Sequence, residues 1–113
     1  MTLIVGPLFN GKRRFAMELL GCGEEELARR AVWDVQDLAG SCADLEVLAA
    51  ELSAHEVVIA TEVGGGVVPA DPAERAAREA AGRLACLLAA RADCVVQMFC
   101  GLPTVLKGEL PEC

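Results

Sequence analysis

The chain has few aromatic residues, no excess of positive charge, no closely spaced cysteine pair and no long apolar run. Aromatic residues make up 4% of its 113 residues, whereas hydrophobic residues of all kinds make up 54%. Ala, Leu and Val must therefore build the core through many small contacts. This length is sufficient for one compact domain over residues 1–113 and too short for two.

The shortage of positive charge bears on the partners of the protein. Ten Lys and Arg residues stand against seventeen Asp and Glu residues, which gives a net charge of −7. Many of them alternate with acids, as in Glu74-Arg75 and Arg78-Glu79. Because a nucleic-acid-binding protein gathers its cations on one face, we expect no nucleic acid partner. A local positive site for a small anion remains compatible with this composition.

The six cysteines show no two-residue spacing of the kind found in zinc knuckles and redox motifs. Their even number would allow disulfide bonds, but we recognise no secretory signal. The apolar run at residues 2–5 is too short for a signal peptide or a membrane span. We therefore expect a cytoplasmic protein with no membrane partner, whose thiols are reduced and mostly buried.

Strand and helix patterns alternate along the chain. Three short apolar runs are typical of strands buried on both faces: residues 2–5, 57–60 and 94–99. A further short strand is expected at residues 31–33. Helical spacing predicts helices over residues 12–20, 42–54 and 72–92, and residues 24–30 form either a short helix or a turn.

Capping signals and apolar faces refine two of these helices. Ser41 is the expected N-cap of the second, and Asp71 followed by Pro72 is the expected start of the last. The residues expected to face the core are Leu45, Leu48, Ala49 and Leu52 in the second helix, and Ala73, Ala76, Ala77, Ala80, Leu84, Leu87 and Leu88 in the last.

This alternation predicts a three-layer α/β fold, with a small, mostly parallel sheet flanked by helices, as in P-loop NTPases. Ligands of such sheets bind beyond the carboxyl ends of the strands. Two glycine loops, at residues 6–11 and 64–66, each follow a predicted strand. Both should open at the same edge, where we expect a single site.

Residues 6–12 fit the pattern G-x-x-x-x-G-K, between a predicted strand and a predicted helix. In such a loop, glycines let successive backbone N–H groups face an anion, and the helix adds the positive end of its dipole. Lys12 would contribute a full positive charge to the β- and γ-phosphates of a purine nucleoside triphosphate. The alternative interpretation is a glycine turn that happens to precede a lysine.

Arg13 occupies the position at which this pattern has Ser or Thr. The hydroxyl at that position normally binds Mg²⁺, whereas arginine is permanently cationic and has no acceptor. The sequence thus supports phosphate binding better than metal-assisted phosphoryl transfer. Arg13 either faces the phosphates or projects into solvent.

The second half of the chain resembles the adenosylcobinamide kinase/adenosylcobinamide-phosphate guanylyltransferase family. Residues 57–69, VVIATEVGGGVVP, are similar to the family's buried strand and its Asn-Glu-Val-Gly-x-Gly-Val-Val-Pro loop. Residues 101–103 and 106–108 are similar to its Gly-Ile-Pro and Leu-Lys-Gly ending. The resemblance covers residues 57–109 and 3–16, and implies a P-loop fold, GTP or ATP as nucleotide, and a corrinoid such as adenosylcobinamide as acceptor.

The middle of the chain departs from this family, which carries a histidine that accepts GMP covalently. His55 is the only histidine, and its place before a strand does not match that nucleophile. The resemblance implies a role near nucleotide or Mg²⁺ for Glu62. The alternative interpretation is a carboxylate that stabilises its own loop. Asp34 is either a carboxylate at a strand end near the metal or a structural residue.

The candidate catalytic residues are Lys12 and Glu62, and Glu62 is the candidate ligand of Mg²⁺. The candidate nucleotide-binding residues are Gly6, Pro7, Leu8, Phe9, Asn10, Gly11, Lys12, Arg13 and Gly64. Three functions remain open: a cobinamide kinase-like enzyme, a nucleotide-binding relative without turnover, and a protein that uses the fold only for partner contacts. A homo-oligomer is expected in each case.

Overall fold

The computed structural model describes residues 1–7, 11–40, 42–61 and 71–109, which form five strands and five helices. The strands are β1 (Thr2–Gly6), β2 (Ala31–Val32), β3 (Val57–Thr61), β4 (Cys94–Phe99) and β5 (Leu102–Lys107). The helices are α1 (Lys12–Leu20), α2 (Glu24–Arg30), α3 (Gln36–Ala39), α4 (Leu45–Leu52) and α5 (Pro72–Arg91).

The strands form one sheet in the order β2-β3-β1-β4-β5. The first four are parallel, and β1 lies at the centre, where Gly6 pairs with Thr61 of β3 and Val5 pairs with Gln97 of β4. Because the three long parallel strands run in one direction, their carboxyl ends meet at one edge of the sheet. The predicted α/β class with a mostly parallel sheet is confirmed.

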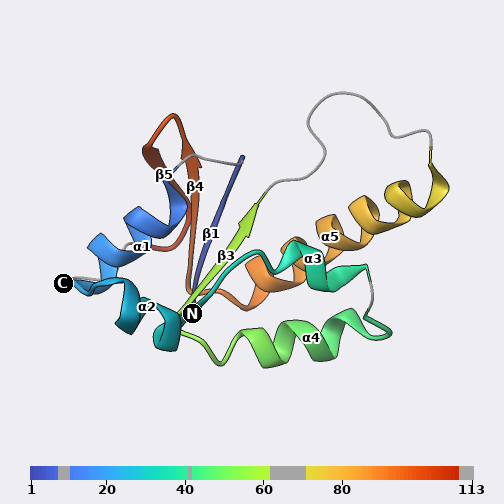
Figure 1. The fold of residues 1–113 in the computed structure, drawn as a ribbon, viewed down its shortest axis with the longest axis horizontal. Coiled ribbons are helices and arrows are strands. Elements are labelled where there is room, and N and C mark those ends of the chain that lie inside the picture. Colours follow the sequence, from blue (N-terminus) through green and yellow to red (C-terminus); the bar gives the residue numbers. More distant parts are fainter. Residues whose placement is uncertain (8–10, 41, 62–70, 110–113) are drawn as a thin grey trace.

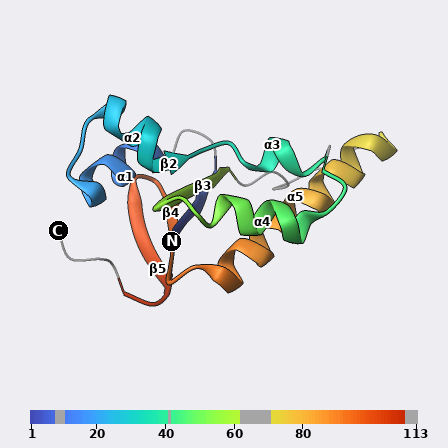
Figure 2. The same cartoon turned by 90° about the horizontal axis from the view of Figure 1, so that it is seen from below.

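Helices cover both faces of the sheet (Figures 1 and 2). On one face, α1 and α2 pack against side chains such as Ile4, Ile59 and Val96. On the other, α3, α4 and α5 pack against alternate positions such as Leu3 and Val58. Since successive strand side chains point to opposite faces, both faces must be apolar, which explains the continuous apolar runs. The predicted three layers are therefore present.

Two helices begin and end much as their sequences predict. Helix α1 occupies the predicted residues 12–20 and ends at Gly21, whose left-handed conformation lets its N–H reach the last carbonyls. Helix α5 begins at Pro72 after Asp71, whose carboxylate accepts a hydrogen bond of 2.9 Å from the Ala73 N–H. Residues 24–30 form a helix, the first of the two alternatives.

The predicted start of α4 was wrong. The helix begins at Leu45 rather than at residue 42, and Asp44 is its N-cap. The Asp44 carboxylate accepts from the N–H groups of Glu46 at 3.0 Å and Val47 at 3.4 Å. Asp is among the best N-cap residues, so the helix begins directly after Asp44. Ser41, the predicted cap, lies outside the described residues.

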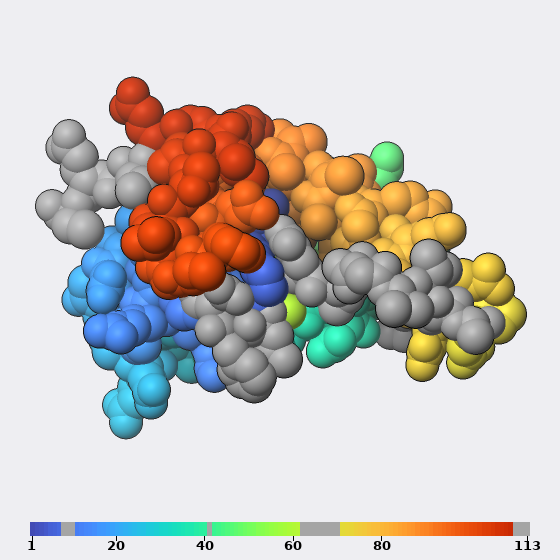
Figure 3. Space-filling model, turned by 90° about the horizontal axis from the view of Figure 1, so that it is seen from above, coloured from blue at the N-terminus to red at the C-terminus, as the bar shows by residue number. Residues whose placement is uncertain are grey.

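The predicted buried face of α5 was wrong in its first two turns. Leu84 and Leu88 are buried, but Ala73, Ala76 and Ala77 are exposed. A helix of 20 residues is about 30 Å long, whereas a strand of six residues spans about 20 Å. The start of α5 (yellow in Figure 3) therefore extends away from the β4–β5 hairpin and the sheet.

The strand β5 was not predicted, because Gly101 and Pro103 indicated an end to regular structure. It pairs antiparallel with β4 through a two-residue turn, Cys100-Gly101, in which both residues have positive φ. Such turns suit the twist of a hairpin, and they are normally signalled by Asn-Gly or Asp-Gly. Pro103 is tolerated because β5 is an edge strand.

The prediction of mostly buried thiols was also wrong. Of the five described cysteines, all of them free, Cys94 alone is buried, and burial raises the pKa of its thiol. Cys86 and Cys100 are exposed. Within the described ranges, no helix combines the length and the apolar character that a membrane crossing requires.

Candidate functional site

The carboxyl edge of the sheet carries the predicted phosphate loop. Gly6 ends β1 between β3 and β4, and a Cβ atom added to it would lie 2.4 Å from the Met98 carbonyl oxygen. Only glycine therefore lets β1 continue to this point without displacing β4. Leu8, Phe9 and Asn10, which follow, lie outside the described residues.

The loop ends in a turn that starts α1. Gly11 has a left-handed conformation, with φ of 75°, and is the N-cap of the helix. Its carbonyl accepts the Phe15 N–H at 2.9 Å, which closes the first helical turn. Helix α1 has no side-chain cap and no acidic residue in its first turn. No acidic side chain in its own first turn therefore offsets the positive end of the helix dipole.

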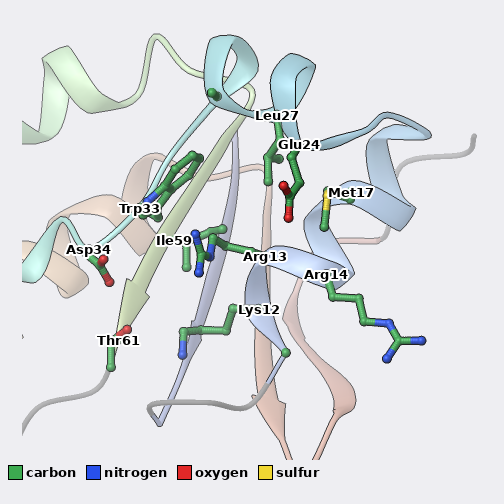
Figure 4. A pocket seen from close by; sticks show the side chains of 12 residues that line it. Lys12, Arg13, Arg14, Met17, Glu24, Leu27, Trp33, Asp34, Ile59 and Thr61 are labelled. Carbon is green, nitrogen blue, oxygen red and sulfur yellow. The ribbon is translucent and has the colours of Figure 1, made fainter.

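Lys12 is a buried charged residue, with 7% of its surface exposed. Its ammonium group donates a hydrogen bond of 2.6 Å to the Pro7 carbonyl. Figure 4 shows its side chain extending from the start of α1 toward the end of β3, where Thr61 lies. The contact places a positive charge at the carboxyl end of β1.

Arg13 points in a different direction from Lys12. Its guanidinium lies over the indole of Trp33, 5.5 Å from the ring centre. Among the residues that the structure describes, no carboxylate is paired with it. Trp33 follows β2 in the chain, so this contact joins the start of α1 to the region beyond β2.

The two cations face a cavity of about 610 Å³ on the α1–α2 side of the sheet (Figure 4). Its volume lies in the range of small-molecule sites, about 300–1,000 Å³. The cavity is lined by Gly11, Lys12, Arg13, Arg14, Met17, Glu24, Leu27, Ala28, Trp33, Asp34, Ile59 and Thr61. Sequence reasoning missed Trp33 and Glu24, although Trp33, the single tryptophan, was a signal that could have been weighed.

The end of β3 and the segment after β2 also line the cavity. Thr61, the last residue of β3, lines the cavity, and its backbone N–H donates to the Gln36 side chain at 3.0 Å. Glu62 and Gly64, predicted to act in catalysis, metal binding and nucleotide binding, lie outside the described residues. Asp34 lines the cavity with a positive φ of 55°, which is uncommon for a residue other than glycine.

A magnesium ion does not fit the donor chemistry at position 13. The pattern requires an oxygen there, and the guanidinium of Arg13 supplies only N–H donors. Among the described residues, no group of three His, Cys, Asp or Glu side chains could hold a metal ion. The nearby oxygen donors of the cavity are single groups on separate elements, namely Glu24, Asp34 and Thr61.

His55 lies at the opposite edge of the sheet. It precedes β3, and its Nδ1 is 3.1 Å from the Leu52 carbonyl oxygen. This agrees with its interpretation as a histidine at a helix–strand junction. Because the site lies beyond the carboxyl end of the same strand, His55 does not belong to it.

Charges at the amino edge are paired with one another. The ammonium of Met1 donates to Asp93 at 2.8 Å, and this hydrogen bond lowers the pKa of Asp93. Arg30 binds both carboxylate oxygens of Glu56, which lowers the pKa of Glu56 and raises that of Arg30. These pairs join elements of the fold.

A family model described as cobinamide kinase / cobinamide phosphate guanyltransferase matches residues 22–106, about three quarters of the chain. The chain belongs to this family. Comparison with individually curated proteins finds no match. The family match covers α2 to β5 and includes Trp33, Asp34 and Thr61 of the cavity wall. It confirms the resemblance inferred from residues 57–109.

Residues 6–12, the predicted phosphate loop, precede the matched range of the cobinamide kinase / cobinamide phosphate guanyltransferase family. Support for an anion site there comes from the geometry of Gly6, Gly11 and Lys12. The sheet with helices on both faces agrees with the P-loop NTPase-like fold expected for the family. Gly11 and Lys12, which precede the matched range, line the same cavity as Trp33, Asp34 and Thr61, which lie within it.

Proposed function

We propose that the chain binds GTP or ATP with its phosphates at residues 6–12, and that it acts on a corrinoid in cobalamin biosynthesis. The observation that carries this proposal is Lys12, a buried ammonium at the start of a helix whose first turn has no acidic residue. The ammonium and the positive end of the helix dipole lie together there, which suits the negative charge of a polyphosphate. Membership of the family supports the corrinoid.

The proposed reaction is transfer of the γ-phosphoryl group to a hydroxyl of the corrinoid side chain. The bond between the γ-phosphorus and the oxygen bridging to the β-phosphate breaks, and a bond from phosphorus to the hydroxyl oxygen forms. The hydroxyl proton passes to a base, for which Glu62 is the candidate, and the nucleoside diphosphate leaves. Lys12 and the loop amides would stabilise the charge on the transferred group.

Calorimetric titration with GTP and with ATP tests the binding step. We expect Lys12→Met to lower the affinity by about 10- to 100-fold, the effect of losing one charge-assisted hydrogen bond. Lys107→Met is the matched control, since Lys107 is exposed and donates to carbonyls at the end of α5. Absence of binding by the unmodified chain, or equal affinity of Lys12→Met, would refute the proposal.

A second function is a nucleotide-binding relative without turnover. Arg13 favours it, because this residue removes the hydroxyl that the pattern provides for Mg²⁺. The two functions separate in an assay of radiolabelled phosphate transfer from nucleotide to cobinamide. Phosphate transfer that is abolished by Glu62→Gln supports the kinase. Tight nucleotide binding without transfer supports the relative without turnover. We do not propose guanylyl transfer through His55, which lies at the other edge.

We further propose that residues 1–113 act as a single cytoplasmic domain and form a homo-oligomer. Support for self-association comes from apolar side chains exposed along the β4–β5 hairpin. These are Phe99, Leu102, Val105 and Leu106, with exposures of 63%, 69%, 42% and 57%. Light scattering after size exclusion tests this, and a monomer at micromolar concentration would contradict it.

A further inference from the structure

We propose that Arg13, held against Trp33, takes over the neutralisation of phosphate charge in the cavity, so that the chain binds its nucleotide without a divalent metal ion. This inference rests on the proposed nucleotide site and specifies its chemistry. It assigns Arg13 a role as a phosphate-binding residue and Trp33 a role as a positioning residue.

The first support is the direction of the Arg13 side chain. Arg13 is the second residue of α1, and although it is exposed, its guanidinium lies over the Trp33 ring in the cavity lining. Figure 4 shows it reaching across the cavity, between Lys12 and Trp33. Both cations of the helix start therefore border the same space.

The second support is the state of the guanidinium. In its stacked contact, the flat face of the guanidinium lies on the face of the indole ring. The N–H groups at the edge of the guanidinium can therefore still donate hydrogen bonds. In the described part of the chain, Arg13 makes no hydrogen bond and no ion pair. The stack limits the rotamers of a long side chain, so less freedom is lost when its planar fork binds two phosphate oxygens.

The third support is the charge of the cavity. Lys12, Arg13 and Arg14 outnumber the carboxylates Glu24 and Asp34 in its lining, although the whole chain carries −7. Arg14 points away from the cavity in Figure 4, and its Nε lies 3.7 Å from a Glu18 oxygen, so Lys12 and Arg13 are the two cations directed toward the cavity and balance its two carboxylates. A divalent cation beside the same phosphates would be repelled by the fixed guanidinium. The site thus favours the metal-free, more negative nucleotide.

The test is calorimetric titration of the full chain with GTP and ATP, once with excess MgCl₂ and once with EDTA. For the unmodified chain we expect affinity in EDTA equal to that in Mg²⁺ or higher. Arg13→Ser restores the hydroxyl of the pattern, and we expect affinity in EDTA to fall about 10-fold or more, with recovery in Mg²⁺. Arg13→Lys keeps the charge without the fork and should lie between the two.

Two further variants separate a local role from a general one. Trp33→Leu should weaken metal-free binding by about 3- to 10-fold through loss of the cation–π contact. Arg75→Ser, an exposed arginine on α5, should leave the Mg²⁺ response of the chain unchanged. Circular dichroism and urea unfolding establish that each variant is folded before titration.

The outcomes distinguish this inference from the proposal beneath it. If the unmodified chain binds at least about 10-fold more tightly with Mg²⁺ than with EDTA, the inference is wrong and the nucleotide site stands. The inference is also wrong if Arg13→Ser leaves the response to Mg²⁺ unchanged. If no nucleotide binds in either buffer, the proposed function itself fails.

Discussion

Helices α1 and α5 each follow a central strand of the sheet in the chain, but their first turns are built in opposite ways. Helix α5 starts with the side-chain cap of Asp71, with Pro72 at its first position and with an acidic residue, Glu74, in its first turn. Helix α1 starts with Gly11, without a side-chain cap, and places Lys12 and Arg13 in its first turn. Among the helices that the structure describes, α1 alone has no acid in that turn.

This difference separates a helix start made for stability from one suited to an anion. In α5 the protein's own groups satisfy the first amides and the helix dipole. In α1 each cation near the positive end of the dipole is unfavourable by about 0.3–1 kcal/mol at an exposed site. A bound polyanion reverses the sign of both interactions. The comparison yields four predictions.

The largest effect should come from Gly6→Ala, at the strand that delivers the chain to α1. Its Cβ would lie 2.4 Å from the backbone oxygen of Met98, so β1 and β4 must separate. We expect a loss of about 3 kcal/mol in the free energy of unfolding, measured in urea. Gly11→Ala is the control: no described atom lies near its Cβ, and the left-handed φ alone should cost about 1–2 kcal/mol. Equal effects would mean that packing at Gly6 is not tight.

Asp71→Ala should lower stability but not nucleotide affinity, whereas Lys12→Met is expected to lower nucleotide affinity. Loss of the cap should lower the free energy of unfolding by about 1 kcal/mol and leave the nucleotide affinity unchanged. Urea unfolding and calorimetry on the same sample measure both. Asp44→Ala in α4 removes an equivalent cap as a control. A fall in affinity with Asp71→Ala would show that the two helix starts are coupled.

Glu74→Lys gives α5 the kind of first turn that α1 has. The free energy of unfolding should fall by about 0.5–1 kcal/mol at low ionic strength, because the sign of the charge near the helix N-terminus changes. In 1 M NaCl most of the loss should disappear through screening. Glu79→Lys, in the middle of the exposed face, should have less effect. A loss that does not depend on salt would contradict the electrostatic explanation.

The smallest effect should come from Glu56→Gln at the amino edge, where charges pair with one another. Arg30 lowers the pKa of Glu56 below its ordinary value of 4.5, so this pair stabilises the fold above that pH and stops doing so as the pH falls below it. The variant should therefore be slightly less stable at pH 7 and lose less stability on acidification. Urea midpoints across this range, with exposed Glu51→Gln as control, measure it. Reduced nucleotide affinity would contradict the separation of the two edges.

The sequence predicted the elements of the central sheet and of α1 because their signals are local. Short, mostly apolar runs of four to six residues define β1, β3 and β4, and glycines bracket α1. It failed for β5, where Cys100-Gly101 makes a hairpin turn without the usual residues. It also failed for the first alanines of α5, since helical spacing does not tell whether a sheet lies beneath them.

For the candidate site, the sequence indicated Gly6, Gly11 and Lys12 but not the direction of the Arg13 side chain. Gly6, Gly11 and Lys12 are contiguous with a strand and a helix, so their arrangement follows from local geometry. The contact of Arg13 with Trp33 joins residues 20 positions apart in the chain. It forms because the start of α1 and the segment after β2 line the same cavity. Sequence reasoning therefore left Arg13 between two orientations.

The sequence by itself determined that a glycine loop with a lysine joins the first buried strand to a helix, because these patterns depend on neighbours within a few residues. Only the tertiary structure decided that Lys12 donates to the Pro7 carbonyl, that Arg13 lies on Trp33, and that His55 stands at the far edge. Strand order and the faces chosen by the helices fix those positions, and both are set by long-range packing of side chains distant in sequence.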